Sequence, residues 1–193
     1  MLKDNKIHTT EINVIFKNKY IELQDNDVIF PNGKTGKYLR VIEKDSKTPG
    51  SVIICINEFN EILLVTLYRY GIDQYSLEFP RGYKDKTEGF IDAGVRELRE
   101  EVNIQDKNIV NVSLIGSFFV NTSNNASEVG VVLIHINSLD LNVKLEIQES
   151  IIESQWLPIK HIKEKIIIGE IKDSFTINAF MFLLINESSL LGE

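Results

Sequence analysis

Residues 82–104 read GYKDKTEGFIDAGVRELREEVNI and place five charged side chains in the six positions from Arg96 to Glu101. At about 100° per residue in a helix, the carboxylates of Glu97, Glu100 and Glu101 fall within an arc of roughly 100°. Like charges spaced three and four residues apart repel each other and destabilise a helix. A hard divalent cation between these carboxylates would relieve that repulsion, so the stretch predicts a helix that binds a metal ion through oxygen ligands.

The same stretch carries an apolar arc that a helix would bury. By the same arithmetic this arc is centred about 130° from Glu97, and it consists of Ile91, Val95, Leu98 and Val102. Ala93 and Gly94 lie one turn before the carboxylates on nearly the same face, and their small size is expected to leave that face open to substrate and metal. Asn103 follows the last periodic residue, and asparagine is common where a chain leaves a helix in left-handed geometry.

The composition is that of an ordinary soluble globular chain. Its 193 residues suit one domain, or one domain with a small appendage, and the content of 43% apolar and 25% charged residues argues against disorder. The net charge of −7 disfavours non-specific binding to nucleic acid or to an anionic membrane. A polar N-terminus and the lack of a long apolar run predict neither a signal peptide nor a membrane span. The single cysteine, Cys55, lies in an apolar run, which indicates a buried thiol, no disulfide framework and a cytoplasmic location.

The sequence predicts two structural units. Residues 11–43 have the alternation and turn residues of a small β unit of three or four strands, and the polar segment 44–50 is expected to be a linker. We therefore expect an N-terminal β unit over residues 1–46 and a main domain over 47–193. A unit of so few strands buries little surface by itself, so it should dock on another surface.

Within the main domain, apolar runs indicate strands near residues 51–56, 61–70, 112–120 and 129–136. The polar loop 121–128 between the last two strands has the composition of a functional loop. Residues 173–185 predict a helix whose N-cap is Asp173 or Ser174.

The acidic stretch also matches a motif with long fixed intervals. The Nudix box reads G-x5-E-x7-R-E-U-x-E-E-x-G-U, where U is aliphatic, and its specified positions correspond to Gly82, Glu88, Arg96, Glu97, Leu98, Glu100, Glu101, Asn103 and Ile104. Asn103 alone departs from the motif, and it suits the left-handed geometry that the glycine provides. The chain therefore resembles the Nudix hydrolase family. This resemblance implies an α/β fold with a mixed β-sheet sandwiched between helices, preceded by the small N-terminal β unit.

The residues before the box narrow the resemblance. Residues 67–82 read LYRYGIDQYSLEFPRG and resemble the corresponding segment of ADP-ribose pyrophosphatases, on the residues Tyr68, Arg69, Glu78, Phe79 and Pro80. Arg81 departs from the pattern, because it replaces a residue that is usually small. The resemblance implies hydrolysis of the diphosphate bond of ADP-ribose or a related nucleoside-diphosphate sugar, giving a nucleoside monophosphate and a sugar phosphate.

The resemblance also implies a metal site. Its cofactor would be Mg²⁺ or Mn²⁺, bound by Glu97, Glu100, Glu101 and a backbone carbonyl at Gly82 or Arg81. Oxygen ligands are those that Mg²⁺ prefers, and a divalent ion would neutralise the diphosphate and lower the pKa of a bound water.

Catalytic and substrate-binding roles follow from the same resemblance. Arg96 is expected to pair with Glu88 or Glu97 and hold that carboxylate in place. The catalytic set is Glu128, Glu100 and Arg96, with either Glu128 or a box glutamate as the general base. The substrate-binding set is Arg69, Glu78 and Arg81, although Glu78 is equally well interpreted as a peripheral metal ligand or as half of a strand salt bridge.

Other functions remain open. The protein could be a Nudix pyrophosphatase of another nucleotide class, such as dinucleoside polyphosphates, capped RNA or non-standard nucleoside triphosphates. A non-catalytic regulator that binds nucleotide sugars is disfavoured because the box carboxylates are intact. The expected partners are a nucleoside-diphosphate-linked small molecule and a second copy of the chain, because the resemblance implies a homodimer through the N-terminal strands. Neither a membrane nor a nucleic acid is an expected partner.

Overall fold

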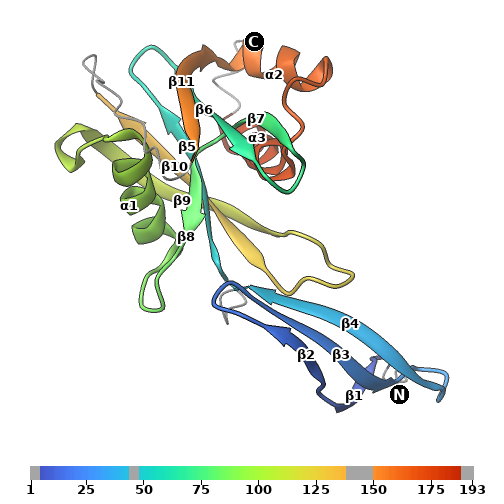
Figure 1. Ribbon diagram of the computed structural model, residues 1–193. Coiled ribbons are helices and arrows are strands. Elements are labelled where there is room, and N and C mark those ends of the chain that lie inside the picture. The colour runs from blue at the N-terminus through green and yellow to red at the C-terminus, as the bar shows by residue number, and fades with distance from the viewer. Residues whose placement is uncertain (1–4, 44–47, 138–149, 188–193) are drawn as a thin grey trace. The chain divides into compact units, whose positions relative to one another are not determined.

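The structure is a computed structural model that describes residues 5–43, 48–137 and 150–187. These residues divide into two compact units (Figure 1). The first unit holds the residues up to Pro49 together with Phe119–Glu128, and the second holds Gly50–Phe118 and the residues from Val129 onwards. The boundary expected between residues 46 and 47 lies outside the described residues and stays a prediction.

The first unit contains a four-stranded antiparallel sheet centred on β3 (Ile21–Ile29). Along one edge of β3 run β1 (His8–Glu11) and then β2 (Val14–Lys17). Along the other edge runs β4 (Thr35–Glu43), in an unbroken register from Ile21 opposite Glu43 to Ile29 opposite Thr35. The small N-terminal β unit that the sequence predicts is therefore present.

The second unit is built on a seven-stranded mixed sheet. Its strand order is β11-β6-β5-β10-β9, with β7 also paired to β6 and β8 also paired to β5. The strands are β5 (Gly50–Ile56), β6 (Glu61–Arg69), β7 (Gln74–Glu78), β8 (Arg81–Tyr83), β9 (Ile109–Phe119), β10 (Glu128–Ile136) and β11 (Ile151–Pro158). Strand β10 runs parallel to β5, whereas β6 and β8 run antiparallel to it, so the predicted mixed sheet is confirmed.

Helices cover both faces of this sheet. The helices α1 (Phe90–Val102) and α3 (Ser174–Asn186) both contact β5 and lie to either side of it in Figure 1, whereas α2 (Ile159–Ile167) follows β11 directly. Ile53 and Cys55 of β5 belong to one apolar cluster with Leu98 and Val102 of α1. The alternating residues of β5 point to the opposite face, as strand geometry requires. Burial raises the pKa of the Cys55 thiol, in agreement with its predicted place in the core. None of the helices in the described part of the chain is long and apolar enough to cross a membrane.

Helix α1 lies close against the sheet. Ala93 and Gly94 are buried, and a Cβ at position 94 would lie 3.2–3.3 Å from the side chain of Val132 on β10. Their small size therefore allows the helix to approach the sheet, and the expectation that it leaves an open face was wrong. Ile91 lies in the first turn of the helix and is 39% exposed, so the predicted apolar arc is not buried along the whole length of the helix.

Helix α1 ends where the sequence predicts. Asn103 adopts left-handed geometry, with φ 58° and ψ 27°, and its N–H donates to the carbonyl of Arg99 at 3.0 Å. This is the conformation that the box glycine would supply.

Substitutions at Asn103 test how much its left-handed backbone geometry contributes to stability. Asn103→Ala should lower the free energy of unfolding by about 1 kcal/mol, because alanine is strained in left-handed geometry. Asn103→Gly should leave it equal or slightly higher. Urea denaturation of the three proteins measures the difference, and an alanine variant as stable as the parent would contradict the left-handed cap.

Candidate active site

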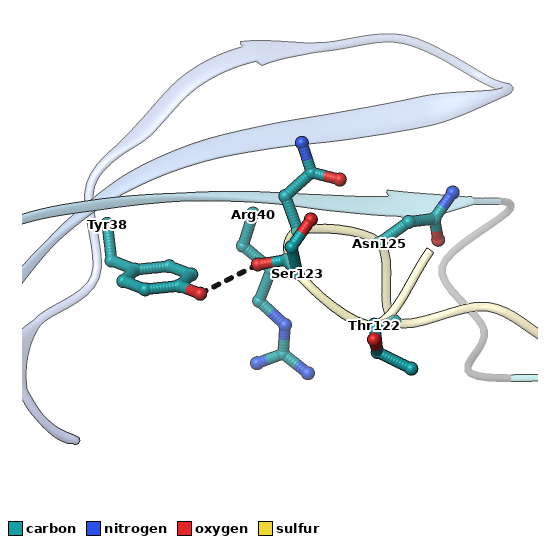
Figure 2. A pocket seen from close by; sticks show the side chains of 7 residues that line it. Tyr38, Arg40, Thr122, Ser123 and Asn125 are labelled. Carbon is teal, nitrogen blue, oxygen red and sulfur yellow. Dashed lines mark hydrogen bonds between the residues drawn. The ribbon is translucent and has the colours of Figure 1, made fainter. Parts of the chain in front are cut away.

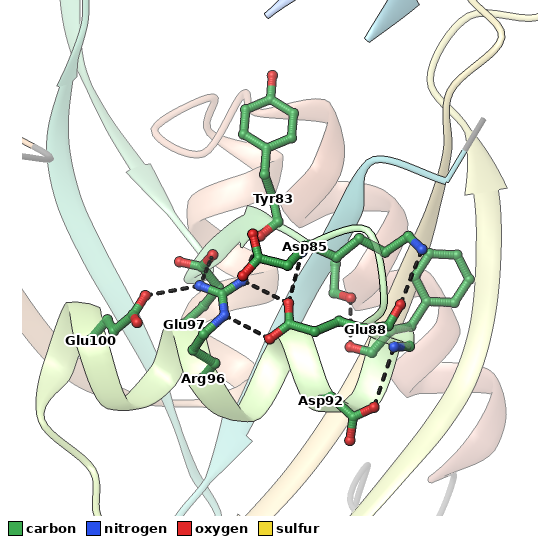
Figure 3. Close-up of polar contacts among 11 residues, drawn as sticks. Tyr83, Asp85, Glu88, Asp92, Arg96, Glu97 and Glu100 are labelled. Carbon is green, nitrogen blue, oxygen red and sulfur yellow. Dashed lines mark hydrogen bonds and ion pairs between the residues drawn. The ribbon is translucent and has the colours of Figure 1, made fainter. Parts of the chain in front are cut away.

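The loop between β8 and α1 is shaped by its own polar groups. The backbone N–H of Asp85 donates to Glu88 Oε2 at 2.8 Å, and the Glu88 N–H donates to the Asp85 carbonyl at 3.1 Å. Lys84 Nζ donates to the Glu88 carbonyl at 3.1 Å. The N–H of Gly89 donates to Asp92 Oδ2 at 3.2 Å, which closes the N-terminus of the helix (Figure 3). These bonds hold the Glu88 carboxylate next to helix α1.

Arg96 joins this loop to the helix (Figure 3). Its guanidinium donates from Nε and Nη2 to the two Glu88 oxygens at 2.9 and 3.0 Å. Nη1 donates to Glu97 Oε1 at 2.8 Å and to Glu100 Oε2 at 2.9 Å. Nη2 also donates to the Tyr83 carbonyl at 2.6 Å. The sequence left open whether Arg96 pairs with Glu88 or Glu97, and it pairs with both.

Arg96 sets the charge state of this group. The hydrogen bonds that Arg96 donates lower the pKa of Glu88, and the acceptance of these bonds by Glu88 and Glu97 raises the pKa of Arg96 itself. The cluster therefore favours the ionised form of Glu88 beside one fixed cation.

The Glu97 carboxylate lies directly against the backbone of Gly82. A Cβ at position 82 would lie 1.9 Å from Glu97 Cδ and 2.2 Å from each of its oxygens, so a side chain there is excluded. Glycine is needed again next to it, because a Cβ at Gly50 would lie 2.0 Å from the Gly82 carbonyl oxygen. Glu97 and Glu101 are 8% and 3% exposed, so two of the three box carboxylates are turned into the protein.

The donor set suits a hard cation. A buried carboxylate beside a backbone segment supplies the oxygen ligands that Mg²⁺ and Mn²⁺ prefer. In the described ranges, however, no group of three acidic, histidine or cysteine side chains is arranged so that it could hold a metal ion. The Glu100 side chain is 51% exposed, and its Oε2 accepts from the same Arg96 Nη1 as Glu97 Oε1 does. The structure thus brings Gly82 and Glu97 together, and Arg96 holds the more exposed Glu100 carboxylate beside Glu97.

A second polar cluster gathers the predicted substrate-binding residues. Glu78 is 1% exposed and forms ion pairs with Arg69 Nη2 at 2.6 Å and with Arg81 Nη2 at 3.2 Å. Burial opposes the ionisation of Glu78, but the Arg69 hydrogen bonds and the Arg81 charge outweigh it and lower the pKa of Glu78. Of the two interpretations of Glu78, the structure contains the salt bridge.

The N-cap and first turn of α3 also belong to this second cluster, through Asp173, Phe175 and Thr176. The sequence pattern did not predict that these three residues lie near Arg81 and Glu78. Arg81 Nη2 lies 3.6 Å from Asp173 Oδ1, and the Arg81 Cζ lies 4.0 Å from the centre of the Phe175 ring. Thr176 Oγ1 accepts a hydrogen bond from the Phe79 N–H at 3.0 Å. Asp173 was a candidate N-cap, and it does cap α3, but no local signal places it beside Arg81.

The remaining predicted residue, Glu128, begins β10 and belongs to the first unit. The loop before it rests on β4, where the Val41 N–H donates to the Asn124 carbonyl at 2.7 Å. Between loop and strand lies a cavity of about 230 Å³, lined by Tyr38, Arg40 and residues 122–126 (Figure 2). The Tyr38 hydroxyl donates to the Ser123 carbonyl at 2.8 Å. The sequence indicated a functional loop here but missed Tyr38 and Arg40, which are distant in the chain.

The family model of the NUDIX domain matches residues 47–175, two-thirds of the chain. The chain belongs to the Nudix family. It is thus a Nudix hydrolase, as the box predicts.

Two curated relatives and one solved structure resemble this Nudix chain. It is 26% identical to the ADP-ribose pyrophosphatase of Bacillus subtilis (strain 168) over 176 residues, 90% of each protein. It is 34% identical to the methanol dehydrogenase activator of Bacillus methanolicus over 98 residues, so that match spans half the length of each protein. A crystal structure of an ADP compounds hydrolase superposes with a TM-score of 0.75 at 17% identity, covering 95% of both chains. This last likeness confirms the predicted fold.

The Glu78 cluster predicts how stability depends on pH. The folded-state pKa of Glu78 lies below its ordinary value of 4.5, so its ionised form stabilises the fold above pH 4.5 and this contribution disappears as the pH falls through the folded-state pKa. Glu78→Gln should lower the free energy of unfolding at neutral pH by about 3 kcal/mol, because it leaves two arginines without their shared partner. The difference should shrink in acid, where Glu78 is protonated.

Urea denaturation at neutral and acidic pH measures this difference. Asp106→Asn is a matched control, because Asp106 is an exposed partner of Arg99 and its loss should cost less than about 1 kcal/mol at either pH. If Glu78→Gln lowered the free energy of unfolding by the same amount at neutral and acidic pH, the stabilising role of the ionised Glu78 carboxylate would be contradicted.

Proposed function

We propose that the protein hydrolyses the diphosphate bond of ADP-ribose or a related nucleoside-diphosphate sugar, giving a nucleoside monophosphate and a sugar phosphate. The observation that carries this proposal is the Glu97 carboxylate against the Gly82 backbone, within a Nudix box whose carboxylates are all present. The likeness to an ADP-ribose pyrophosphatase along 90% of the chain supports the substrate class.

We further propose that Mg²⁺ or Mn²⁺ is held by Glu97, Glu100, Glu101 and a backbone carbonyl at Gly82 or Arg81. A divalent ion bound there would neutralise the diphosphate oxygens and make a water more acidic. Arg96 positions Glu97 and Glu100 for this task through its hydrogen bonds at 2.8 and 2.9 Å.

Arg69 is the proposed contact to the substrate diphosphate. Its side chain is 31% exposed, and its hydrogen bonds to Glu78 orient the guanidinium while leaving it accessible. A guanidinium suits phosphate because its planar N–H groups match two phosphate oxygens at once. Glu128 is the proposed general base, with a box glutamate as the alternative. The base takes a proton from the attacking water as the new P–O bond forms and the bridging P–O bond breaks.

Incubation with ADP-ribose and Mg²⁺ tests the reaction, and AMP and ribose phosphate are the expected products. Glu97→Gln and Glu100→Gln should each lower kcat by about 100-fold or more, because even the outer partners of metal ligands are worth 10–100-fold. Arg99→Gln is the matched control on the same helix, since Arg99 pairs with Asp106 outside the cluster, and it should keep the parent rate.

Two outcomes would contradict this assignment. A parent protein that turns over no member of a diphosphate panel would reject hydrolysis of this bond. A Glu100→Gln variant at the parent rate would remove Glu100 from the ligand set.

Another substrate class remains an alternative. Dinucleoside polyphosphates, capped RNA and non-standard nucleoside triphosphates carry the same kind of bond, and a side-by-side comparison of kcat/KM separates them from ADP-ribose. A regulatory role is a second candidate function, favoured by the likeness over 98 residues to a methanol dehydrogenase activator. Tight binding of ADP-ribose without hydrolysis would support a regulator.

We also propose a homodimer formed through the N-terminal strands. Both β1 and β2 are exposed along their whole length. They and the turns beside them expose a group of large apolar side chains: Ile12, Val14, Ile15, Phe16 and Tyr20, which are 47–64% exposed. Such an apolar group on a small sheet is typical of a surface that a second copy covers.

Light scattering at micromolar concentration should give about twice the chain mass of 22.1 kDa. Phe16→Glu should shift the protein to a monomer by placing charge in the interface. Ile185→Glu is the matched control, because Ile185 is 72% exposed on α3, in the second unit, and it should leave the dimer intact. A monomeric parent would overturn the proposal.

A further inference from the structure

The first turn of α3 is fastened to the segment that precedes the Nudix box. Thr176 is fully buried, and its Oγ1 accepts from the Phe79 N–H at 3.0 Å while donating to Asp173 Oδ2 at 2.8 Å. Asp173 Oδ2 also accepts from the Thr176 N–H at 2.8 Å, which caps the helix. The segment and the helix terminus are therefore joined by buried hydrogen bonds, which are costly to break.

Arg81 makes a second, ionic connection between the same two elements. Its Nη2 lies 3.2 Å from Glu78 Oε2 and 3.6 Å from Asp173 Oδ1, and its guanidinium carbon lies 4.0 Å from the centre of the Phe175 ring. Stacking on the ring and two carboxylates together fix the plane of the guanidinium. The Arg81 side chain is 21% exposed, so most of it is committed to these contacts.

Arg81 and Arg69 share one carboxylate oxygen. Glu78 Oε2 lies 2.6 Å from Arg69 Nη2 and 3.2 Å from Arg81 Nη2. Glu78 is buried, so its orientation depends on the cations beside it. Removing Arg81 would leave Arg69 as the only remaining ion-pair partner of Glu78 among the described residues, beside a side-chain hydrogen bond with Ser76. Glu78 and Arg69 would then have lost the cation that holds the pair on the α3 side.

We propose that Arg81 is a positioning residue that acts through Glu78 to set the orientation of the Arg69 guanidinium. The first turn of α3 is the fixed support from which it does so. This inference rests on the proposed function, in which Arg69 contacts the substrate diphosphate. Arg81 therefore acts on substrate binding indirectly and not as a substrate contact. Helix α3 takes part in substrate binding because it holds Arg81 in place.

A double-mutant cycle on ADP-ribose hydrolysis tests this inference. Arg81→Ala should raise KM by about 10-fold with kcat within about 3-fold, the effect of one weakened charge-assisted hydrogen bond to substrate. The same change in an Arg69→Ala background should have little further effect on KM, because groups that act through one another are not additive. The KM of Arg81→Lys should lie between those of the parent and Arg81→Ala, since lysine keeps the charge and loses the stacked, planar contact.

Additive effects of the two substitutions would overturn the inference, because they would make Arg81 an independent substrate contact. An unchanged KM in Arg81→Ala would overturn it as well. If Arg81→Ala does not fold, as judged by circular dichroism, the cycle with Arg81→Lys gives the same decision. Arg99→Ala is the matched control and should leave KM unchanged in both backgrounds. Failure of the proposed function is distinct, because the parent protein would then turn over no ADP-ribose at all.

Discussion

The hydrogen bonds of a single guanidinium, that of Arg96, are the interaction on which the candidate site depends. Each like-charge pair on α1 costs about 0.2–0.5 kcal/mol. Each hydrogen bond to a charged partner contributes about 1.5–3 kcal/mol, less where the partner is as exposed as Glu100. Arg96 therefore outweighs the repulsion that the acidic stretch creates. The crowding of carboxylates remains consistent with a cation, but it does not require one for the helix to be stable.

The short segment from Glu78 to Tyr83 lies between two charge clusters. On one side, Arg96 reaches the Tyr83 carbonyl, and Glu97 lies against Gly82. On the other side, Glu78 holds two arginines, and the first turn of α3 is bonded to Phe79. Both helices therefore act on the same backbone, from opposite faces of β5. The geometry of this segment is set by side chains that come from three separate parts of the chain.

The sequence predicted what depends on regular spacing. Helix geometry identifies α1 and its end at Asn103, whereas the pairing of Arg96 with Glu88 or Glu97 came from the family resemblance, because Glu88 lies in the loop before the helix. The contact between Arg81 and Asp173 could not be predicted, since the two residues are far apart in the chain and no periodicity relates them. Periodicity also failed for Gly94, because it identifies a face of a helix without showing what covers that face.

Gly50 and Gly82 have a consequence for how this activity can be lost. The α-carbon of Gly50 faces the Gly82 carbonyl, and the α-carbon of Gly82 faces the Glu97 carboxylate, each too closely for any side chain. A single methyl group at position 50 would displace the backbone that carries the site while every box carboxylate stayed unchanged. Among related chains, an intact set of carboxylates is therefore not sufficient evidence of hydrolysis. An inactive homologue could keep every box carboxylate and differ from an active one only at a glycine that takes no part in the reaction.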